Sequence, residues 1–163
     1  LGSVTVHRVV DMDPFRLRLS FILPQADLGQ LDEHREWLAQ GHIDYATGDV
    51  LLAVQSHVVR VGGKVILVDT CVGEHKPRTR RAEWNARRNS PYLANLAAAG
   101  CRPEDVDYVL CSHLHVDHVG WNTQLEDGRW VPTFPNARYI VSGTELAHTR
   151  AEVARDPQVN HGS

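Results

Sequence analysis

The apolar positions in the first seventy residues predict four extended segments. Val4 to Val10 is rich in β-branched residues, and Phe15 to Leu23 is a second apolar stretch that ends at a proline. Leu51 to Val61 and Lys64 to Asp69 are joined by Gly62-Gly63, which is a strong hairpin signal because glycine supplies the positive φ of a tight turn. Since both faces of the last segment are apolar, we expect it to be covered on both sides.

An amphipathic helix is predicted between these segments. Leu28, Leu31 and Leu38 fall on one helical face, so we expect a helix from Leu28 to Gln40. Asp27 and Gln30 have the spacing of a capping box at its start.

Helices and strands alternate in the rest of the chain. Ser90-Pro91 opens a predicted helix that Gly100 closes, and Ser142 with Glu145 caps another that runs to about Arg155. Short strands are expected from Val106 to Cys111 and from Arg138 to Val141. This alternation predicts an α/β fold built of layers.

The composition is that of an ordinary globular domain. Of the 163 residues, 42% are hydrophobic and 23% charged, and the formal net charge of −3 favours neither nucleic acid nor an anionic membrane as a partner. We see no membrane span and no secretory leader, so we expect a cytoplasmic location, although a leader could precede Leu1. Cys71, Cys101 and Cys111 lie far apart, and we expect buried thiols rather than disulfides.

A group of metal-binding residue types follows the predicted strand that ends at Cys111. In extended backbone alternate residues share a side, so His113, His115 and Asp117 can face one point, while His118 projects another way and suits a second metal close by. Imidazole and carboxylate are ligands that zinc accepts. The alternative is a solvated histidine-rich turn in a chain with ten histidines, but the apolar strand before the group and Gly120 behind it favour the metal site.

This stretch resembles the signature of the metallo-β-lactamase superfamily. Ile66 to Thr70 is similar to that superfamily's strand ending in an aspartate, and Asn95 to Gly100 with Pro103 to Val109 is similar to the helix and strand before the motif. The resemblance covers about Val50 to Leu146. Within the superfamily, the chain most resembles the lactonase and organophosphate-hydrolase group.

The resemblance implies an αβ/βα sandwich with a site for two metal ions, usually zinc, with manganese, iron or cobalt as alternatives. His113 and His115 would hold the first ion, and Asp117 and His118 the second. Asp117 would also orient the attacking water, and Asp69 would be a carboxylate near the ligand loop. The superfamily's third histidine, bridging aspartate and last histidine have no match here. For His148 and His161 we expect surface or helix roles.

The chain therefore looks like the N-terminal half of a single domain over residues 1–163. Within it we expect an N-terminal segment, 1–48, which could form a lid, and a metal-binding αβ half, 49–163. The remainder of the fold or a second chain would be needed to cover the sheet and complete the ligands, and a homodimer is one way to supply it.

Three further features have two interpretations each. Trp121 could form a wall of the substrate pocket or pack under the loop, and His75 could line the pocket or be solvated. The basic stretch from Lys76 to Arg81, with Arg87-Arg88, could attract an anionic substrate or nucleic acid, but we expect a solvated helix face.

The predicted function is hydrolysis of an ester, lactone or related bond in a small-molecule substrate by a metal-activated water. A phosphodiesterase or nuclease with the same metals is the first alternative. An inactive metal-binding fragment or interaction module is the second.

Overall fold

The computed structural model describes residues 2–156, which fold into two compact units. Residues 2–11 together with residues 55–156 form unit 1, and Met12–Val54 forms unit 2. The predicted division at residue 48 and the single domain over residues 1–163 stay predictions, and residues 157–163 lie outside the described part.

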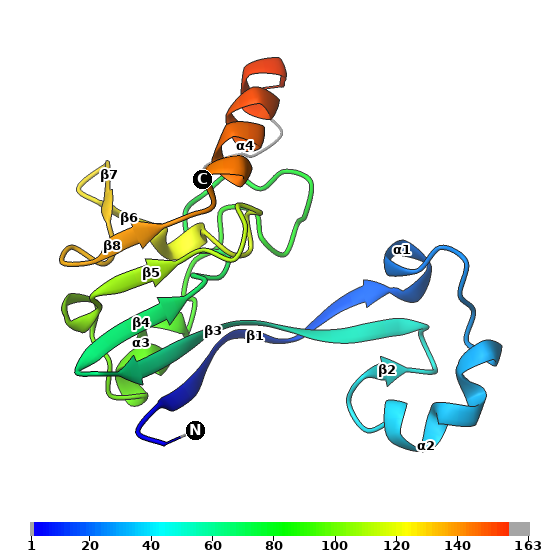
Figure 1. Ribbon diagram of the computed structural model, residues 1–163. Coiled ribbons are helices and arrows are strands. Elements are labelled where there is room, and N and C mark those ends of the chain that lie inside the picture. Colours follow the sequence, from blue (N-terminus) through cyan, green and yellow to red (C-terminus); the bar gives the residue numbers. More distant parts are fainter. Residues whose placement is uncertain (1, 157–163) are drawn as a thin grey trace. The chain divides into compact units, whose positions relative to one another are not determined.

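A mixed sheet carries most of the strands (Figure 1). Its strand order is β1-β3-β4-β5-β8, with the short β2 beside β3. The β3–β4 pair is antiparallel, whereas β4–β5 and β5–β8 are parallel. The strand bounds are Thr5–Arg18 (β1), Ile43–Asp44 (β2), Asp49–Val61 (β3), Lys64–Val68 (β4), Tyr108–Leu110 (β5) and Arg138–Ile140 (β8). The mixed α/β class is as predicted.

The β3–β4 hairpin forms at the two glycines, as the sequence predicts. Val61 pairs with Lys64, and Gly62 and Gly63 have φ angles of 57° and 72°, the left-handed conformation that a two-residue turn needs. The expectation that β4 is covered on both sides is only partly right. Leu67 is fully buried, but its neighbours on β4 are half-buried or exposed.

Two α-helices of unit 1, α3 (Tyr92–Ala98) and α4 (Gly143–Arg155), begin close to their predicted caps. The unit also has the 3-10 turns η2 (Pro103–Asp105) and η3 (Gly120–Asn122). Figure 1 shows α3 behind β3 and β4, and the Tyr92 hydroxyl lies 2.9 Å from Ser56 Oγ on β3 in the buried core. At α4 the Ser142 side chain accepts a hydrogen bond from Glu145 N, as its capping spacing predicts.

A second hairpin was not predicted, although its signal was present. Strands β6 (Thr123–Glu126) and β7 (Arg129–Pro132) pair antiparallel around Asp127-Gly128, whose φ angles of 49° and 76° are both positive. Asp-Gly is a typical sequence for such a turn, and the apolar Leu125 and Trp130 lie two residues from it on either side.

Unit 2 corrects two predictions. The extended stretch from Phe15 to Leu23 ends early, because β1 stops at Arg18 and Leu19–Ile22 form one turn of helix, α1. The helix predicted from Leu28 to Gln40 is a 3-10 segment, η1 (Gly29–His34), followed by a single turn, α2 (Arg35–Leu38). Of these two segments only Leu38 is buried, so no continuous apolar stripe stabilises a longer helix.

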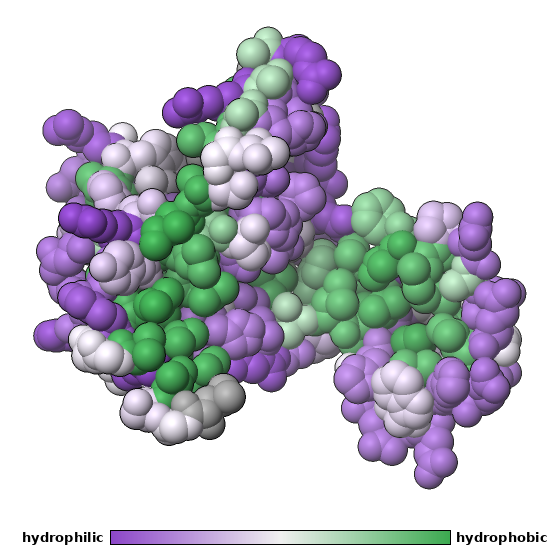
Figure 2. Space-filling model, in the orientation of Figure 1, coloured by the Kyte–Doolittle hydropathy of each residue, from purple (hydrophilic) through white to green (hydrophobic). Residues whose placement is uncertain are grey.

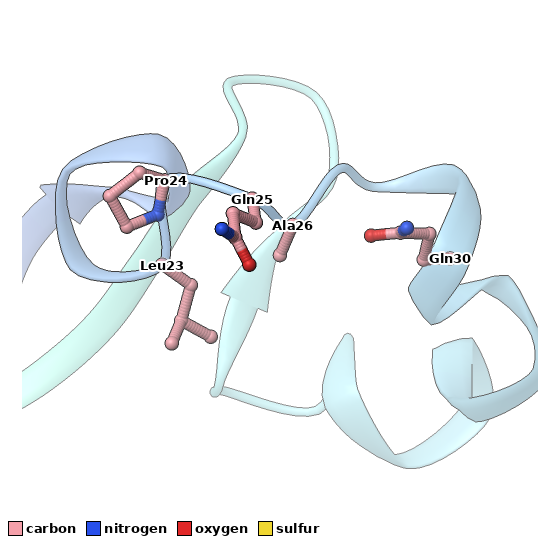
Figure 3. A pocket seen from close by; sticks show the side chains of 5 residues that line it. All are labelled: Leu23, Pro24, Gln25, Ala26 and Gln30. Carbon is pink, nitrogen blue, oxygen red and sulfur yellow. The ribbon is translucent and has the colours of Figure 1, made fainter.

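The surface of unit 2 has a shallow hollow (Figure 3). Its walls are Leu23, Pro24, Gln25, Ala26 and Gln30. None of these side chains titrates, so the hollow offers no acid, base or metal ligand. Figure 2 shows apolar residues reaching the surface of both units.

The three cysteines are buried and free, which confirms the prediction made from their spacing. Across residues 2–156 no helix has the length and apolar character to cross a membrane.

Candidate metal centre

The candidate site lies where β4 and β5 end. Because these strands are parallel, their carboxyl ends meet at one edge of the sheet, and Asp69 after β4 lies beside Ser112 after β5. Asp69 has a φ of 59°, in the left-handed region that aspartate tolerates better than most residues. This turn directs the Asp69 carboxylate to the loop that carries the histidines.

The four predicted ligands lie together on that loop as two pairs. His113 Nε2 is 3.0 Å from His115 Nδ1, and His118 Nε2 is 3.5 Å from an oxygen of Asp117. The ring centroids of His113 and His118 are 3.9 Å apart, so the two pairs adjoin. His113, Asp117 and His118 are half-buried, and His115 is exposed.

Asp69 fastens this loop through three hydrogen bonds. Its carboxylate accepts from Ser112 N at 2.7 Å, from Ser112 Oγ at 2.8 Å and from His118 Nδ1 at 2.8 Å. Ser112 Oγ is also 3.0 Å from His113 Nδ1. A serine hydroxyl has a single hydrogen, which here goes to Asp69, so the oxygen accepts from His113 Nδ1.

These contacts fix which imidazole nitrogen carries a lone pair. In neutral His113 and His118 the Nδ1–H groups are held by Ser112 and Asp69, so both Nε2 atoms are left with lone pairs. A histidine that donates its other N–H to a carboxylate or hydroxyl is oriented as metal-binding histidines are. Sequence reasoning missed Ser112, whose role depends on the left-handed turn at Asp69.

The electrostatics of the site follow from the same contacts. Burial opposes ionisation of Asp69, but hydrogen bonds from His118 and Ser112 outweigh it and lower the pKa of its carboxyl. Burial also works against the charged form of His118, yet Asp69 and Asp117 raise its pKa. The pKa of His113 is lowered by burial and by the neighbouring His118 and His115.

The backbone beyond the predicted ligands is held by hydrogen bonds against the segment after β4. Thr70 N donates to His118 O at 2.7 Å, and Gly120 N donates to Cys71 O at 2.7 Å. A Cβ on Gly120 would lie 1.9 Å from the carbonyl carbon of Val72, so no other residue fits there. Glycine at position 120 therefore permits the two chain segments to cross in contact.

The start of α4 holds the same loop from another direction. The Glu145 carboxylate accepts a hydrogen bond from Leu114 N at 3.1 Å, between the two histidines of the first pair. The sequence assigned Glu145 to helix capping alone, and nothing in its spacing showed this second contact.

The other candidate residues have contacts of their own. Trp121 is buried and stacks on Tyr92 with ring centroids 5.7 Å apart, so it packs under the loop. His75 lies after β4 near Glu74, with its Nε2 3.9 Å from that carboxylate. His148 is exposed on α4 beside Glu152, and His161 is outside the described residues.

The expectation for the basic segment is wrong in two respects. Residues 76–88 form an irregular loop rather than a helix, and Lys76 and Arg78 are buried, with 2% and 4% of their surface exposed. The loop folds back on itself, with Ala86 N donating to Lys76 O and Arg78 N to Asn85 Oδ1. This covers side chains that a charge run would normally present to solvent.

The donor atoms within each pair, His113 with His115 and Asp117 with His118, are spaced so that each pair could bind one divalent metal ion with two ligands. Two donors at zinc bond lengths are about 3.3 Å apart at a tetrahedral angle, close to the separation within each pair. Within residues 2–156, however, no three histidine, cysteine, aspartate or glutamate side chains are grouped to hold one ion. These pairs could each supply two ligands of a fuller coordination shell.

Comparison with known proteins matches this chain to a family. Residues 49–160 match the model of the metallo-beta-lactamase superfamily. The N-acyl homoserine lactonases AttM of Azorhizobium caulinodans and Agrobacterium fabrum are 33% and 32% identical over 95 and 93 residues, which are 58% and 56% of this chain. The matched part spans about a third of each lactonase, 33% and 32% of their lengths.

Solved structures share the fold. A probable metal-dependent hydrolase from Staphylococcus aureus has a TM-score of 0.70 at 19% identity, over 92% of this chain and 50% of that one. The dizinc quorum-quenching lactonase AidC has a TM-score of 0.65 at 21% identity, and the match covers 90% of this chain and 44% of that one. The hydrolase AbOPH has a TM-score of 0.60 at 28% identity, and the match covers 97% of this chain and 46% of that one. With its family model matched over residues 49–160 and its fold shared with these hydrolases, the chain belongs to the metallo-beta-lactamase superfamily.

Proposed function

We propose that this chain carries four metal ligands of a hydrolase that cleaves an ester or lactone with water, with two zinc ions as the first expectation. The arrangement of donors carries the proposal. The donor atoms within each of two adjacent pairs are 3.0 Å and 3.5 Å apart, close to the separation of two ligands on one zinc ion. Ser112 and Asp69 accept hydrogen bonds from Nδ1 of His113 and His118, which leaves the Nε2 atoms of both with lone pairs. The family and the lactonase relatives support the reaction class.

We propose that each pair of side chains binds one of the two ions. His113 and His115 would hold one ion, and Asp117 and His118 the other. Ions bound there would supply a water that ionises near neutral pH and would polarise the carbonyl oxygen of the substrate. Asp117 is 30% exposed, so its carboxylate can also accept a hydrogen bond from the attacking water and orient it. Asp69 keeps His118 in the required tautomer.

Further ligands are required for tight binding, because catalytic zinc sites have at least three protein ligands. The chain matches about a third of the length of its curated relatives. We therefore propose that further polypeptide, in the same chain or in a second one, supplies the remaining ligands.

Metal content and lactone hydrolysis, measured on the complete natural polypeptide, test this function. We expect mass spectrometry to find about two metal ions per site. We also expect ring opening of a hexanoyl homoserine lactone, which is measured through the proton that it releases. His113→Ala and Asp117→Ala should lose metal and at least about a hundredfold in kcat/KM, since both the activated water and the polarisation of the carbonyl depend on the ions.

His148→Ala is the matched control, because this histidine is exposed on α4 and should change neither measurement. Full metal content and turnover in His113→Ala or Asp117→Ala would refute the assignment. Cleavage of bis(4-nitrophenyl) phosphate in preference to the lactone would favour the phosphodiesterase alternative.

A further inference from the structure

Strand β5 lies between β4 and β8, and all three strands run parallel (Figure 1). The segments that follow these strands therefore leave the same edge of the sheet. The segment after β5 carries the predicted ligands. The segment after β4 begins with Asp69, and the segment after β8 leads into α4, whose first turn contains Glu145. Carboxylates from both neighbouring strands can therefore reach the loop between them.

The backbone N–H groups on either side of His113 donate to these two carboxylates. Ser112 N donates to Asp69 Oδ1 at 2.7 Å, and Leu114 N donates to Glu145 Oε1 at 3.1 Å. Glu145 and Leu114 are half-buried, so water competes only in part for their hydrogen bond. The first predicted ligand is therefore held through both of its neighbours in sequence.

The Leu114 contact bears on the geometry of the first pair. His113 Nε2 and His115 Nδ1 are 3.0 Å apart, and Leu114 is the one residue between the two histidines. Its N–H belongs to the planar peptide group that joins it to His113, so the hydrogen bond to Glu145 fixes the orientation of that plane. Rotation of the plane would move the His115 ring relative to His113 and change the separation of their donor atoms.

The backbone of Glu145 is itself well placed. Cys111 N donates to Ile140 O at 2.9 Å, which extends the pairing of β5 with β8 to the start of the ligand loop. Ser142 Oγ accepts from Glu145 N at 3.5 Å, and this cap fixes the first turn of α4. The Glu145 carboxylate therefore reaches the loop from a helix start that is tied to the neighbouring strand.

We propose that Glu145 is a positioning residue, which sets the separation of His113 and His115 through Leu114 N and thereby strengthens binding of the first metal ion. This inference rests on the proposed function, because the ion belongs to that proposal. Across residues 2–156 no three histidine, cysteine, aspartate or glutamate side chains are grouped to hold one ion. Glu145 therefore acts through the backbone of the loop and not as a third ligand beside the two histidines.

Hydrogen exchange and zinc affinity, measured on the complete natural polypeptide, test this role. In the metal-free protein, the Leu114 amide should exchange at least about tenfold faster in Glu145→Ala than in wild type, because it loses its acceptor. Competition with a fluorescent chelator should show that the same variant binds one of the two zinc ions at least about tenfold more weakly.

Glu145→Gln separates the hydrogen bond from the charge. Glutamine keeps a side-chain oxygen that can accept from Leu114 N, so the exchange rate and the zinc affinity should both stay within about threefold of wild type. Equal losses in Glu145→Gln and Glu145→Ala would overturn the proposal, because the charge of the carboxylate would then be responsible.

Glu152→Ala is the matched control. It makes the same substitution on α4, where the Glu152 carboxylate lies 3.4 Å from the exposed His148, and it should change neither measurement. An equal change in Glu152→Ala would overturn the proposal. A lower melting temperature of Glu145→Ala, with Leu114 exchange and zinc affinity as in wild type, would also overturn it, because Glu145 would then stabilise only the helix.

The wild type separates this inference from the proposed function. A wild type that takes up no zinc and opens no lactone would refute the hydrolase function and, with it, the role of Glu145 toward an ion. A wild type that binds two zinc ions no more tightly than Glu145→Ala would refute the role of Glu145 alone.

Discussion

Asp69 Oδ2 lies 2.8 Å from His118 Nδ1, so a carboxylate at the end of β4 orients an imidazole that lies eight residues after the end of β5. Asp69→Asn should test this relationship cleanly, since asparagine also tolerates the left-handed backbone at position 69. We expect zinc affinity to fall about ten- to hundredfold, as when an outer carboxylate is removed from a metal-bound histidine.

Competition with a fluorescent chelator measures this affinity. Asp127→Asn is the control, because it makes the same chemical change in the β6–β7 turn, where Asn-Gly is favoured. Equal zinc affinity in Asp69→Asn and wild type would show that Asp69 has no part in metal binding.

Lys76 should make stability depend on pH in the alkaline range. Burial, with a smaller effect from Arg78, lowers its pKa from 10.5 to about 8. Between these values the unfolded chain binds a proton that the folded chain does not, so stability rises with pH. Relative to Lys76→Met, the wild type should gain up to about 3 kcal/mol in free energy of unfolding between pH 8 and pH 10.5.

Urea unfolding of the metal-free proteins at several pH values gives this difference, and the groups common to both proteins cancel. A difference in free energy of unfolding that stays constant across the pH range would mean that the folded state does not lower the pKa of Lys76.

Gly120→Ala should be strongly destabilising. The new Cβ would lie 1.9 Å from Val72 C and 2.4 Å from Gly73 N, and backbone atoms cannot yield as a flexible side chain can. We expect a loss of at least about 2 kcal/mol by chemical denaturation, together with weaker metal binding. Gly143→Ala is the control, because a Cβ there meets nothing within 4 Å and alanine favours the helix.

Asp11→Ala should destabilise the fold by about 2 kcal/mol, because it leaves the half-buried Arg87 guanidinium and the Ser90 hydroxyl without this acceptor. The Asp11 carboxylate is buried and accepts from Arg87 Nη1 at 2.8 Å and from Ser90 Oγ at 2.6 Å. Arg80→Ala, which breaks only an exposed ion pair, should change the free energy of unfolding by less than about 0.5 kcal/mol. Similar effects of the two substitutions would contradict the structural role of Asp11.

Local signals predicted the hairpin at Gly62-Gly63, the start of α4 and the grouping of the four candidate ligands. Each depends on neighbours in sequence: turn conformation, capping, or residue types at close spacing on one loop. The helix predicted from Leu28 to Gln40 failed because three leucines at helical spacing do not ensure a surface to pack against.

Long-range contacts escaped prediction for a different reason. The fate of Arg78 depends on a loop that folds over it, and a run of basic residues looks the same in sequence whether its members are solvated or buried. The contact of Glu145 with Leu114 likewise joins residues 31 apart in sequence. The further ligands that we propose and the role of Asp117 stay predictions.

The crossing at Gly73 and Gly120 has a consequence for the directed evolution of this protein. A side chain at position 73 would meet the carbonyl oxygen of residue 120 at 2.5 Å, and one at position 120 would meet the backbone of residues 72 and 73. Neither glycine can be exchanged alone, and exchanging both adds bulk on each side of the same contact. Libraries aimed at new substrates should leave this crossing fixed and diversify loop residues that lie away from it.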